Sequence, residues 1–274
     1  MMLSKQEFER FSEIVYRHLG IKMPGGKRTM LSARVHKRLR ALEMETFQEY
    51  ADFLFSPEGQ QAELAHLYDV VTTNKTDFFR EPGHFTYLTD AVLPALAERR
   101  DALRFWSAGC SSGEEPYTLA MVLSHYRETQ RDIRFDILAT DISRKALDLA
   151  MRAVYREEQI VPVPAPFRKK YLLRSRDRSA RLTRIAPEIR QCVTFGRLNF
   201  MDEDFAIRHP MDVIFCRNVI IYFDKRTQEE LIRKFCRHLL PGGFLFLGHS
   251  ESLHGIDLPL TQVAPTIYRK VAEE

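Results

Sequence analysis

The stretch LRFWSAGCSSGEEPY, residues 103–117, decides how the rest of this chain is interpreted. An apolar run that ends at Trp106 passes into a loop of small residues, and Pro116 then opens a segment with apolar residues at helical spacing. Strand, small-residue loop and helix N-terminus, in this order, are typical of the ligand-binding edge of a parallel sheet. The acidic pair in the loop would repel a phosphate group, so it favours a ligand that carries positive charge. A tight connection that binds no ligand is the alternative.

The composition is that of an ordinary globular protein. The chain has 274 residues, of which 45% are hydrophobic and 28% charged, and this length allows two structural units. No apolar run approaches a membrane span and residues 1–10 do not resemble a secretory signal, so we expect a cytoplasmic protein without membrane insertion. The four cysteines are scattered and form no CxxC pair, which predicts reduced, mostly buried thiols and no metal site.

Residues 1–72 carry helical patterns and no strand signal. Capping boxes at Ser4 and Thr46 open two helices, Gly20 ends the first, and further helices are predicted over residues 27–42 and 58–71. We therefore expect an all-helical N-terminal domain.

The predicted helix over residues 27–42 is basic and has no acidic residue. At about 100° per residue, Arg34, Lys37 and Arg40 fall away from its apolar stripe, and Arg38 lies on the flank of that stripe. Charge of one sign repels itself, so the face is either a solvated helix surface or a docking surface for an acidic partner.

Residues 73–274 read as a doubly wound α/β domain, because apolar strands alternate with helical patterns. Strands are predicted at 134–140, 211–216 and 244–247, and a last strand at 266–271 closes an antiparallel edge. A small antiparallel insertion is predicted at about residues 165–196. Its apolar segments are short, its other residues are largely basic, and the prolines of VPVPAP exclude a helix at its entry.

Two features of this domain have alternative interpretations. Asp141 follows the second predicted strand, where an acidic residue typically accepts hydrogen bonds from ribose hydroxyls, but it can also cap the next helix. The segment TTNKTDFFREP, residues 72–82, is either a connecting loop with two core phenylalanines or a functional loop that offers Asn74, Thr76 and Arg80 to a site.

With these pieces placed, the chain resembles the CheR family of bacterial chemotaxis receptor methyltransferases. The resemblance rests on motifs in a specific order: TTNKTDFFRE, AGCSSGEEPYTLAM, ATDIS, RLNF, MDVIFCRNVIIYF and LLPGGFLFLGHSESL. It covers nearly the whole chain. It implies a class I S-adenosylmethionine-dependent methyltransferase sheet of Rossmann-like type, with an all-helical N-terminal domain and a small antiparallel β insertion. The implied reaction methylates glutamate side chains of receptors and yields S-adenosylhomocysteine.

The resemblance also implies roles for single residues. Arg80 and Tyr222 would orient the substrate carboxylate, and Glu114, with Glu115 as the alternative, would face the methionine part of the cofactor. The remaining implied cofactor residues are Asn74, Thr76, Arg80, Asp141, Leu198, Asn199, Arg217 and Asn218. Cys110 stands where the family usually has a small residue without a thiol, and we expect no functional consequence.

The partner implied by the resemblance is the glutamate-rich cytoplasmic helical domain of chemoreceptors. The face formed by Arg34, Lys37, Arg38 and Arg40 would then steer an acidic helix, and the insertion would hold a receptor's C-terminal peptide, as in some members. Two other functions compete. An RNA methyltransferase is disfavoured because the basic segments carry few aromatic residues, so no nucleic-acid partner is expected. A non-catalytic S-adenosylmethionine-binding module is disfavoured by the joint presence of the implied site residues.

Overall fold

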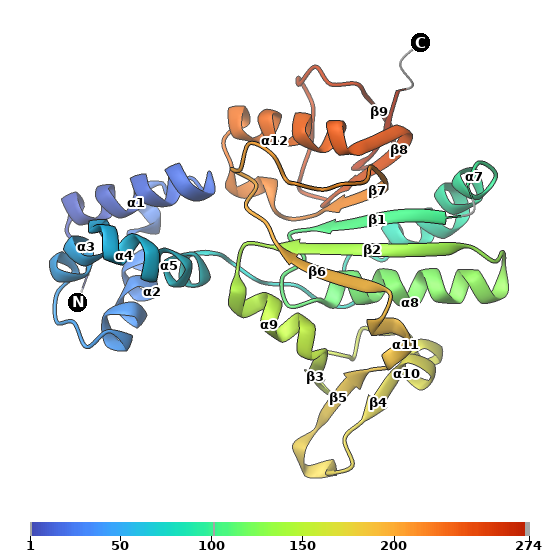
Figure 1. Cartoon of the computed structure of the whole chain (residues 1–274), viewed down its shortest axis with the longest axis horizontal. Helices are drawn as coiled ribbons and strands as arrows, with labels where there is room; N and C mark the ends of the chain where they lie inside the picture. Colours follow the sequence, from blue (N-terminus) through green and yellow to red (C-terminus); the bar gives the residue numbers. More distant parts are fainter. Residues whose placement is uncertain (1, 101, 272–274) are drawn as a thin grey trace.

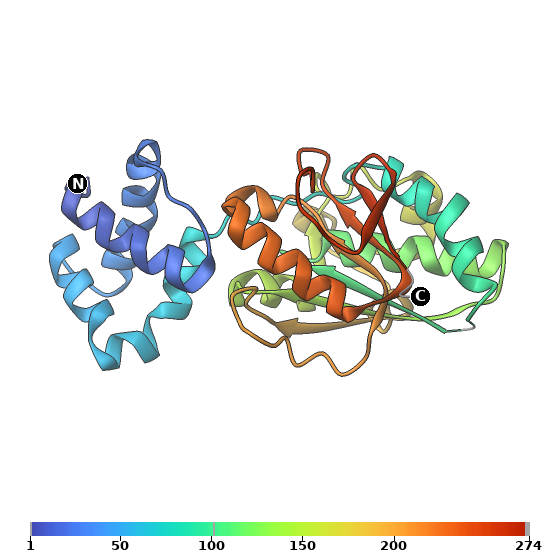
Figure 2. The same ribbon diagram turned by 90° about the horizontal axis from the view of Figure 1, so that it is seen from above.

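The structure, a computed structural model, describes residues 2–100 and 102–271. A helical domain lies at one end of an α/β domain, and the chain crosses between them in an extended segment (Figures 1 and 2). Among the described residues, none of the helices combines the length and the hydropathy that a membrane crossing requires.

The helical domain is built from capped amphipathic helices. Both predicted capping boxes are present, at Ser4 with Glu7 and at Thr46 with Glu49. Gly20 ends the first helix in the left-handed conformation, with φ of 68°. The elements are α1 (Lys5–Leu19), η1 (Gly25–Lys27), α2 (Arg28–Ala41), α3 (Phe47–Phe55), α4 (Pro57–Ala62) and α5 (Leu64–Val71).

The helix predicted over residues 58–71 is interrupted in the structure. Glu63 lies between α4 and α5, and its side chain is only 2% exposed. Arg38 and Tyr50 bind its carboxylate inside the domain. The apolar pattern continues through this break, so it gave no sign that the helix changes direction there.

A seven-stranded mixed sheet forms the centre of the α/β domain, in the order β6-β2-β1-β7-β8-β10-β9. The first five strands are parallel, and β10 runs antiparallel to both of its neighbours, as predicted. The strands are β1 (Ala102–Ala108), β2 (Arg134–Asp141), β6 (Val193–Arg197), β7 (Met211–Cys216), β8 (Leu239–Leu247), β9 (Leu260–Ala264) and β10 (Ile267–Lys270).

The two faces of the sheet carry separate cores. On one face, Phe105 packs with residues of α7 (Leu93–Ala97) and α8 (Glu114–Thr129). On the other, Trp106 packs with α12 (Lys225–His238), and its indole Nε1 donates to Thr140 Oγ1 at 2.9 Å. This alternation fixes the register of β1 and therefore the point at which the glycine loop leaves the sheet. The remaining elements are α6 (Gly83–Tyr87), η2 (Leu88–Val92), α9 (Arg144–Arg152) and η4 (Ile220–Tyr222).

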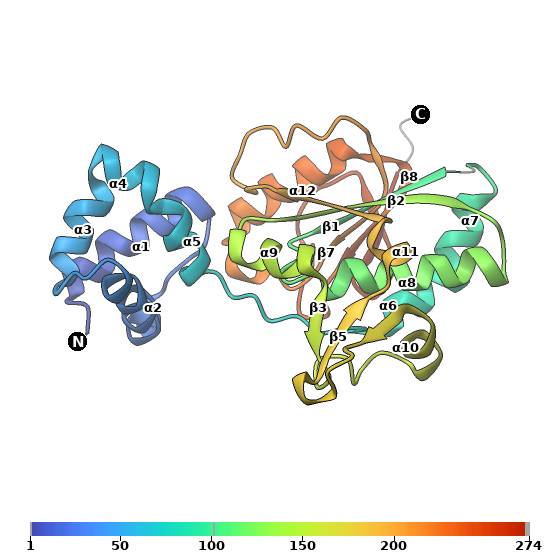
Figure 3. The same ribbon diagram turned by 60° about the horizontal axis from the view of Figure 1, so that its bottom comes forward.

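The small insertion is a three-stranded antiparallel sheet that projects from the large one (Figures 1 and 3). Its boundaries differ from the prediction: it begins at residue 154, and the segment 193–197 is a parallel strand of the large sheet. VPVPAP does not exclude a helix, because α10 begins within it and holds its proline in the first turn, where no backbone donor is needed. The elements are β3 (Val154–Arg156), α10 (Ala165–Tyr171), β4 (Leu172–Arg174), η3 (Arg178–Ala180), β5 (Leu182–Ile185) and α11 (Pro187–Arg190).

Candidate active site

A cavity lies at the carboxyl edge of the parallel strands, where the helical domain meets the α/β domain. It encloses about 980 Å³ of empty space, part of which is open to solvent. Both domains and the segment between them contribute to its wall. The residues are Leu19, Ile21, Thr72, Thr73, Asn74, Lys75, Thr76, Asp77, Arg80, Phe85, Gly109, Ser111, Glu115, Asp141, Ile142, Leu198, Asn199, Phe200, Arg217, Asn218, Val219, Tyr222 and Phe223.

The glycine loop brings main chain to the cavity wall. Gly109 has φ of 87°, and a Cβ added there would lie 2.6 Å from Cγ2 of Val219. Only glycine therefore fits this point of close approach. The amides of Gly109 and Cys110 donate to the carbonyl of Thr140 at 2.8 and 2.9 Å, which ties the loop to the end of β2.

Asp141 is buried in the wall, 9% exposed, and does not cap a helix. Its two carboxylate oxygens accept from the amides of Ser111 and Ser143 at 2.8 and 2.9 Å. The cap of α9 is Ser143, whose hydroxyl accepts from the amide of Ala146. Burial raises the pKa of Asp141, while the amide donors oppose this shift.

The two glutamates of the GEEPY turn point in different directions. Glu115 lines the cavity, accepts from Ser107 Oγ at 2.7 Å and pairs with Arg217. Glu114 is absent from the wall, and its carboxylate accepts from Ser112 and Gln159. The geometry therefore favours Glu115, the alternative of the sequence prediction, as the contact for a cationic ligand.

Arg217 is the centre of a buried ionic cluster. Its side chain is 2% exposed and lies 2.9 Å from Glu81 Oε2 and 3.2 Å from Glu115 Oε2. It also donates to the main-chain carbonyl of Arg80. Burial raises the pKa of Glu115, an effect that Arg217 reduces. A buried guanidinium needs such partners, because desolvation would otherwise destabilise it by several kcal/mol.

Asn218 lies beside this cluster with a positive φ of 58°. Its amide donates to Oε2 of Glu251 at 2.8 Å, and the amide of Gly248 donates to the same oxygen at 2.6 Å. Glu251 is 4% exposed, so the strand end at residues 216–218 is held by a buried carboxylate. Glu81 and Glu251 lie within the motifs that carry the family resemblance, but the sequence alone assigned neither residue a role.

The segment 72–82 contributes both to the core and to the cavity wall. Phe78 is buried in the core, while Asn74, Thr76 and Arg80 line the cavity. Arg80 Nη1 donates to the carbonyl of Lys75 at 3.0 Å, and the described residues offer its guanidinium no carboxylate within ion-pair distance. This cation at the cavity wall therefore remains available to an acidic substrate.

Tyr222 lies at the contact between the two domains. Its carbonyl accepts from the amide of Lys22 at 3.0 Å, and Lys27 Nζ is 5.8 Å from its ring centroid. Asn199, predicted with Leu198 near the adenine, donates from Nδ2 to the carbonyl of His18 at 2.8 Å. Leu198, Asn199 and Tyr222 all line the cavity, so the helical domain completes the wall beside predicted site residues.

The basic residues of α2 do not form one free surface. Arg38 makes a bidentate pair with buried Glu63, at 2.6 and 2.9 Å. Arg34 donates to the carbonyls of Val71 and Thr72 and to Thr73 Oγ1, so it holds the segment between the domains. Lys37 and Arg40 are exposed, and ion pairs of the described residues do not include them.

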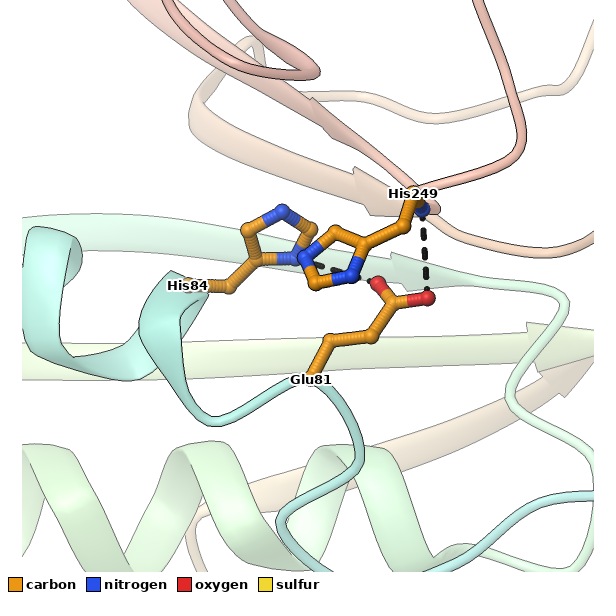
Figure 4. Close-up of side chains that lie close together, drawn as sticks. All are labelled: Glu81, His84 and His249. Carbon is orange, nitrogen blue, oxygen red and sulfur yellow. Dashed lines mark hydrogen bonds and ion pairs between the residues drawn. The ribbon is translucent and has the colours of Figure 1, made fainter.

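A cluster of Glu81, His84 and His249 has the spacing of a metal site, with ligand atoms within 4.8 Å of one another (Figure 4). Glu81, however, is already paired with Arg217, a cation that would repel a metal ion. Burial, with Arg217 as the next cause, lowers the pKa of His84 to about 4, so the ring is neutral near neutral pH. We therefore assign the Glu81 carboxylate to Arg217 and not to a metal.

Comparison with known proteins identifies the family. Residues 74–268 match the family described as CheR methyltransferase, SAM binding domain, and residues 6–72 match CheR methyltransferase, all-alpha domain. The chain belongs to the CheR methyltransferase family. It is similar to the chemotaxis protein methyltransferase of Borreliella burgdorferi, with 39% identity over 98% of this chain and 95% of that one. Chemotaxis protein methyltransferase 2 of Pseudomonas aeruginosa is 37% identical over 97% of this chain and 93% of its own length. The chemotaxis protein methyltransferase of Escherichia coli is 36% identical over 98% of this chain and 92% of its own length.

The CheR assignment makes the chain an S-adenosylmethionine-dependent methyltransferase. The cavity fits this cofactor in its chemistry. Glu115 and Asp141 give the wall acidic residues, which suit a ligand with ammonium, sulfonium and ribose hydroxyl groups, and Leu198 and Phe200 give it apolar residues. Gly109 allows close approach of the ligand to the main chain.

Proposed function

We propose that this CheR protein methylates glutamate side chains of chemoreceptors and so forms glutamate methyl esters for sensory adaptation. The observation that carries the proposal is Arg80: its guanidinium lies in the cavity wall, and among the described residues it has no acidic partner. A substrate carboxylate is the complementary group for this position. Tyr222, in the same wall, supplies a second donor.

The chemistry requires no general base. A glutamate side chain with pKa of about 4.3 is ionised at neutral pH and is already a nucleophile. When bound, S-adenosylmethionine supplies a methyl group activated by the positive charge on sulfur. The charges of nucleophile and sulfonium diminish as the methyl group is transferred, so a partly dry cavity favours the reaction. Arg80 and Tyr222 therefore act by orienting the substrate oxygen.

The cofactor roles follow from the cavity wall. We propose that Glu115 meets the ammonium group, Asp141 the ribose hydroxyls, and Leu198 with Asn199 the adenine. Asn74, Thr76, Arg217 and Asn218 lie in the same wall and complete the contacts. Glu114 has no such role in this proposal, because its carboxylate is bound to Ser112 and Gln159.

The decisive assay is transfer of labelled methyl groups from S-adenosylmethionine to receptor-bearing membranes, with total RNA as the competing substrate. Label on the receptor fraction that is released by mild alkali identifies a carboxyl methyl ester. Label on RNA would replace the proposal by the nucleic-acid alternative. Binding of S-adenosylhomocysteine without transfer to either substrate would leave a non-catalytic binding module.

We further propose that receptor docking uses the exposed cations of α2, Lys37 and Arg40. Arg34 and Arg38, which helical periodicity places with them, have partners within the chain. Reversal of both exposed charges, Lys37→Glu with Arg40→Glu, is expected to weaken receptor methylation and its salt dependence while cofactor binding is unchanged. Methylation that is insensitive to both charge and salt would make this face a solvated surface.

A receptor's C-terminal peptide is a second proposed partner, bound at the insertion. The strand β4 is an edge of the three-stranded sheet, so it offers unpaired main-chain groups to an extended peptide. Binding of the full-length receptor and of a receptor that lacks its C-terminal tail should then differ. Equal affinities would remove the insertion from the proposal. Chemoreceptor substrates of this kind place the enzyme in the cytoplasm.

A further inference from the structure

The buried guanidinium of Arg217 lies between two carboxylates, one in the cavity wall and one outside it. Glu115 and Arg217 line the cavity, whereas Glu81 lies behind Arg217, outside the wall. The three side chains are 13%, 2% and 11% exposed, in the order Glu115, Arg217, Glu81. Charge at this depth is weakly screened by solvent, so each group strongly affects a ligand in the cavity.

The hydrogen bonds of Glu81 keep its charge directed at Arg217. Its Oε2 accepts from Nη2 and Nε of Arg217 at 2.9 and 3.2 Å. Its Oε1 accepts from the amide of His249 at 3.1 Å and from Asn218 Nδ2 at 3.4 Å. Figure 4 shows the carboxylate in contact with the main chain of His249 and beside the ring of His84. Burial acts to raise the pKa of Glu81, but Arg217 and the other donors together hold it below its ordinary value.

The charges that face the cofactor follow from this arrangement. The positive charge of Arg217 offsets the negative charge of one carboxylate. The second carboxylate leaves the cluster with a net charge of −1. His84 is neutral near neutral pH and does not change this sum. Glu81 lies outside the wall and neutralises Arg217. The remaining negative charge is therefore that of Glu115, which lines the cavity.

We propose that Glu81 is a positioning residue that neutralises the charge of Arg217 from the side away from the cavity, and that it thereby raises the affinity for S-adenosylmethionine relative to that for S-adenosylhomocysteine. The two ligands differ by one methyl group and by the positive charge on sulfur. Without Glu81, Arg217 would pair with Glu115 alone, and the cluster would be neutral. The cationic cofactor would then lose its electrostatic advantage over the neutral thioether product.

This inference rests on the cofactor assignment, and its test separates the two. Calorimetry would give dissociation constants for both ligands with the wild-type chain, Glu81→Gln and Glu81→Asp. Binding of either ligand by the wild type tests the cofactor site, whereas the ratio of the two constants tests the inference. The ratio is measured within one variant, so a general loss of affinity from altered packing cancels.

Glu81→Gln, which keeps the shape of the side chain but not its charge, is expected to shift the ratio about tenfold against S-adenosylmethionine. Glu81→Asp keeps the charge and should keep the ratio even where both affinities fall. His249→Ala is the matched control, because it removes a neighbouring ring but not the amide that Glu81 accepts from, and its ratio should equal that of the wild type.

Equal weakening of both ligands in Glu81→Gln, or no change in either, would overturn the inference and leave Glu81 with a purely structural role. A ratio shift in Glu81→Asp as large as in Glu81→Gln would also overturn it, since charge would then not be the cause. If Glu81→Gln does not fold, Glu81→Ala takes its place as the variant without the charge: a ratio shifted against S-adenosylmethionine supports the inference, and an unchanged ratio refutes it.

Discussion

The buried ion pair between Arg38 and Glu63 allows an experiment that distinguishes two roles for a basic residue of α2, stabilising the helical domain and docking the receptor. Arg38 is 16% exposed and Glu63 2%, and the carboxylate also accepts from the hydroxyl of Tyr50 at 2.9 Å. The hydrogen bond that Arg38 donates to Glu63 raises the pKa of Arg38, which keeps the guanidinium charged. In Arg38→Met the packing of the side-chain stem is largely kept, but Glu63 loses its only cationic partner among the described residues.

Breaking one partner of a buried pair destabilises by about 3 kcal/mol or more, whereas removing both partners is often nearly neutral. We therefore expect Arg38→Met to reduce the free energy of unfolding of the helical domain by about 3 kcal/mol. The double variant Arg38→Met with Glu63→Leu should recover part of this loss, because the buried charge is removed but the hydroxyl of Tyr50 loses its acceptor. Lys37→Met, one position away on the exposed face, should change the free energy of unfolding by less than about 0.5 kcal/mol.

Hydrogen exchange followed by mass spectrometry measures this in the full-length protein. Slowly exchanging amides of α2, α3 and α5 should exchange on the order of a hundredfold faster in Arg38→Met, while the sheet strands remain protected. The reasoning is refuted if Arg38→Met and Lys37→Met exchange alike and both reduce receptor methylation to the same extent. Arg38 would then be a docking residue, as the helical periodicity alone indicated.

Three further predictions concern the cavity. Gly20→Ala should destabilise the contact between the domains by about 2–3 kcal/mol, because φ is 68° and the new Cβ would lie 2.6 Å from Sδ of Met201; an unchanged melting curve and cofactor affinity would contradict this. Tyr222→Phe should keep cofactor affinity in calorimetry but lower the methylation rate about tenfold or more, whereas a matching loss of affinity would place Tyr222 in the cofactor pocket. Cofactor affinity should fall as pH falls from neutral through the pKa of Glu115, which burial raises above 4.5, because the bound cation favours the ionised carboxylate. Glu115→Gln should weaken this dependence and leave the part that comes from Asp141, and an affinity that rises toward acid would contradict the prediction.

Much of the fold was predictable because each element carries a local signal. Capping boxes at Ser4 and Thr46 and the apolar runs of β1, β2 and β7 depend on neighbouring residues alone, and the structure has them where they were expected. The insertion was bounded incorrectly because its strands are short. The sequence pattern of residues 193–197 is compatible with a strand of the insertion and with a strand beside β2. Only the tertiary contacts of the segment determine which of the two sheets it joins.

The candidate site was predictable in its motifs and less so in its side-chain directions. Glu114 and Glu115 are adjacent at the first turn of α8, where successive side chains diverge by about 100°. The rotation of that turn is set by Gly113, whose φ is 97° and cannot be inferred from its neighbours. Likewise, the partners of Arg34 and Arg38 lie 25 or more residues away along the chain, beyond the reach of helical periodicity.

The turn after α1 has a consequence for how enzymes of this family can be recombined. The amide of Lys22 in this turn donates to the carbonyl of Tyr222, and His18 at the end of α1 accepts from the side-chain amide of Asn199. Leu19, the last residue of α1, and Ile21 in the turn form part of the cavity wall. The helical domain thus contributes to the wall of the cavity in addition to its proposed role in receptor docking. Chimeras that exchange helical domains between relatives in order to redirect receptor choice will alter cofactor affinity as well, unless the turn is inherited together with the catalytic domain it was fitted to.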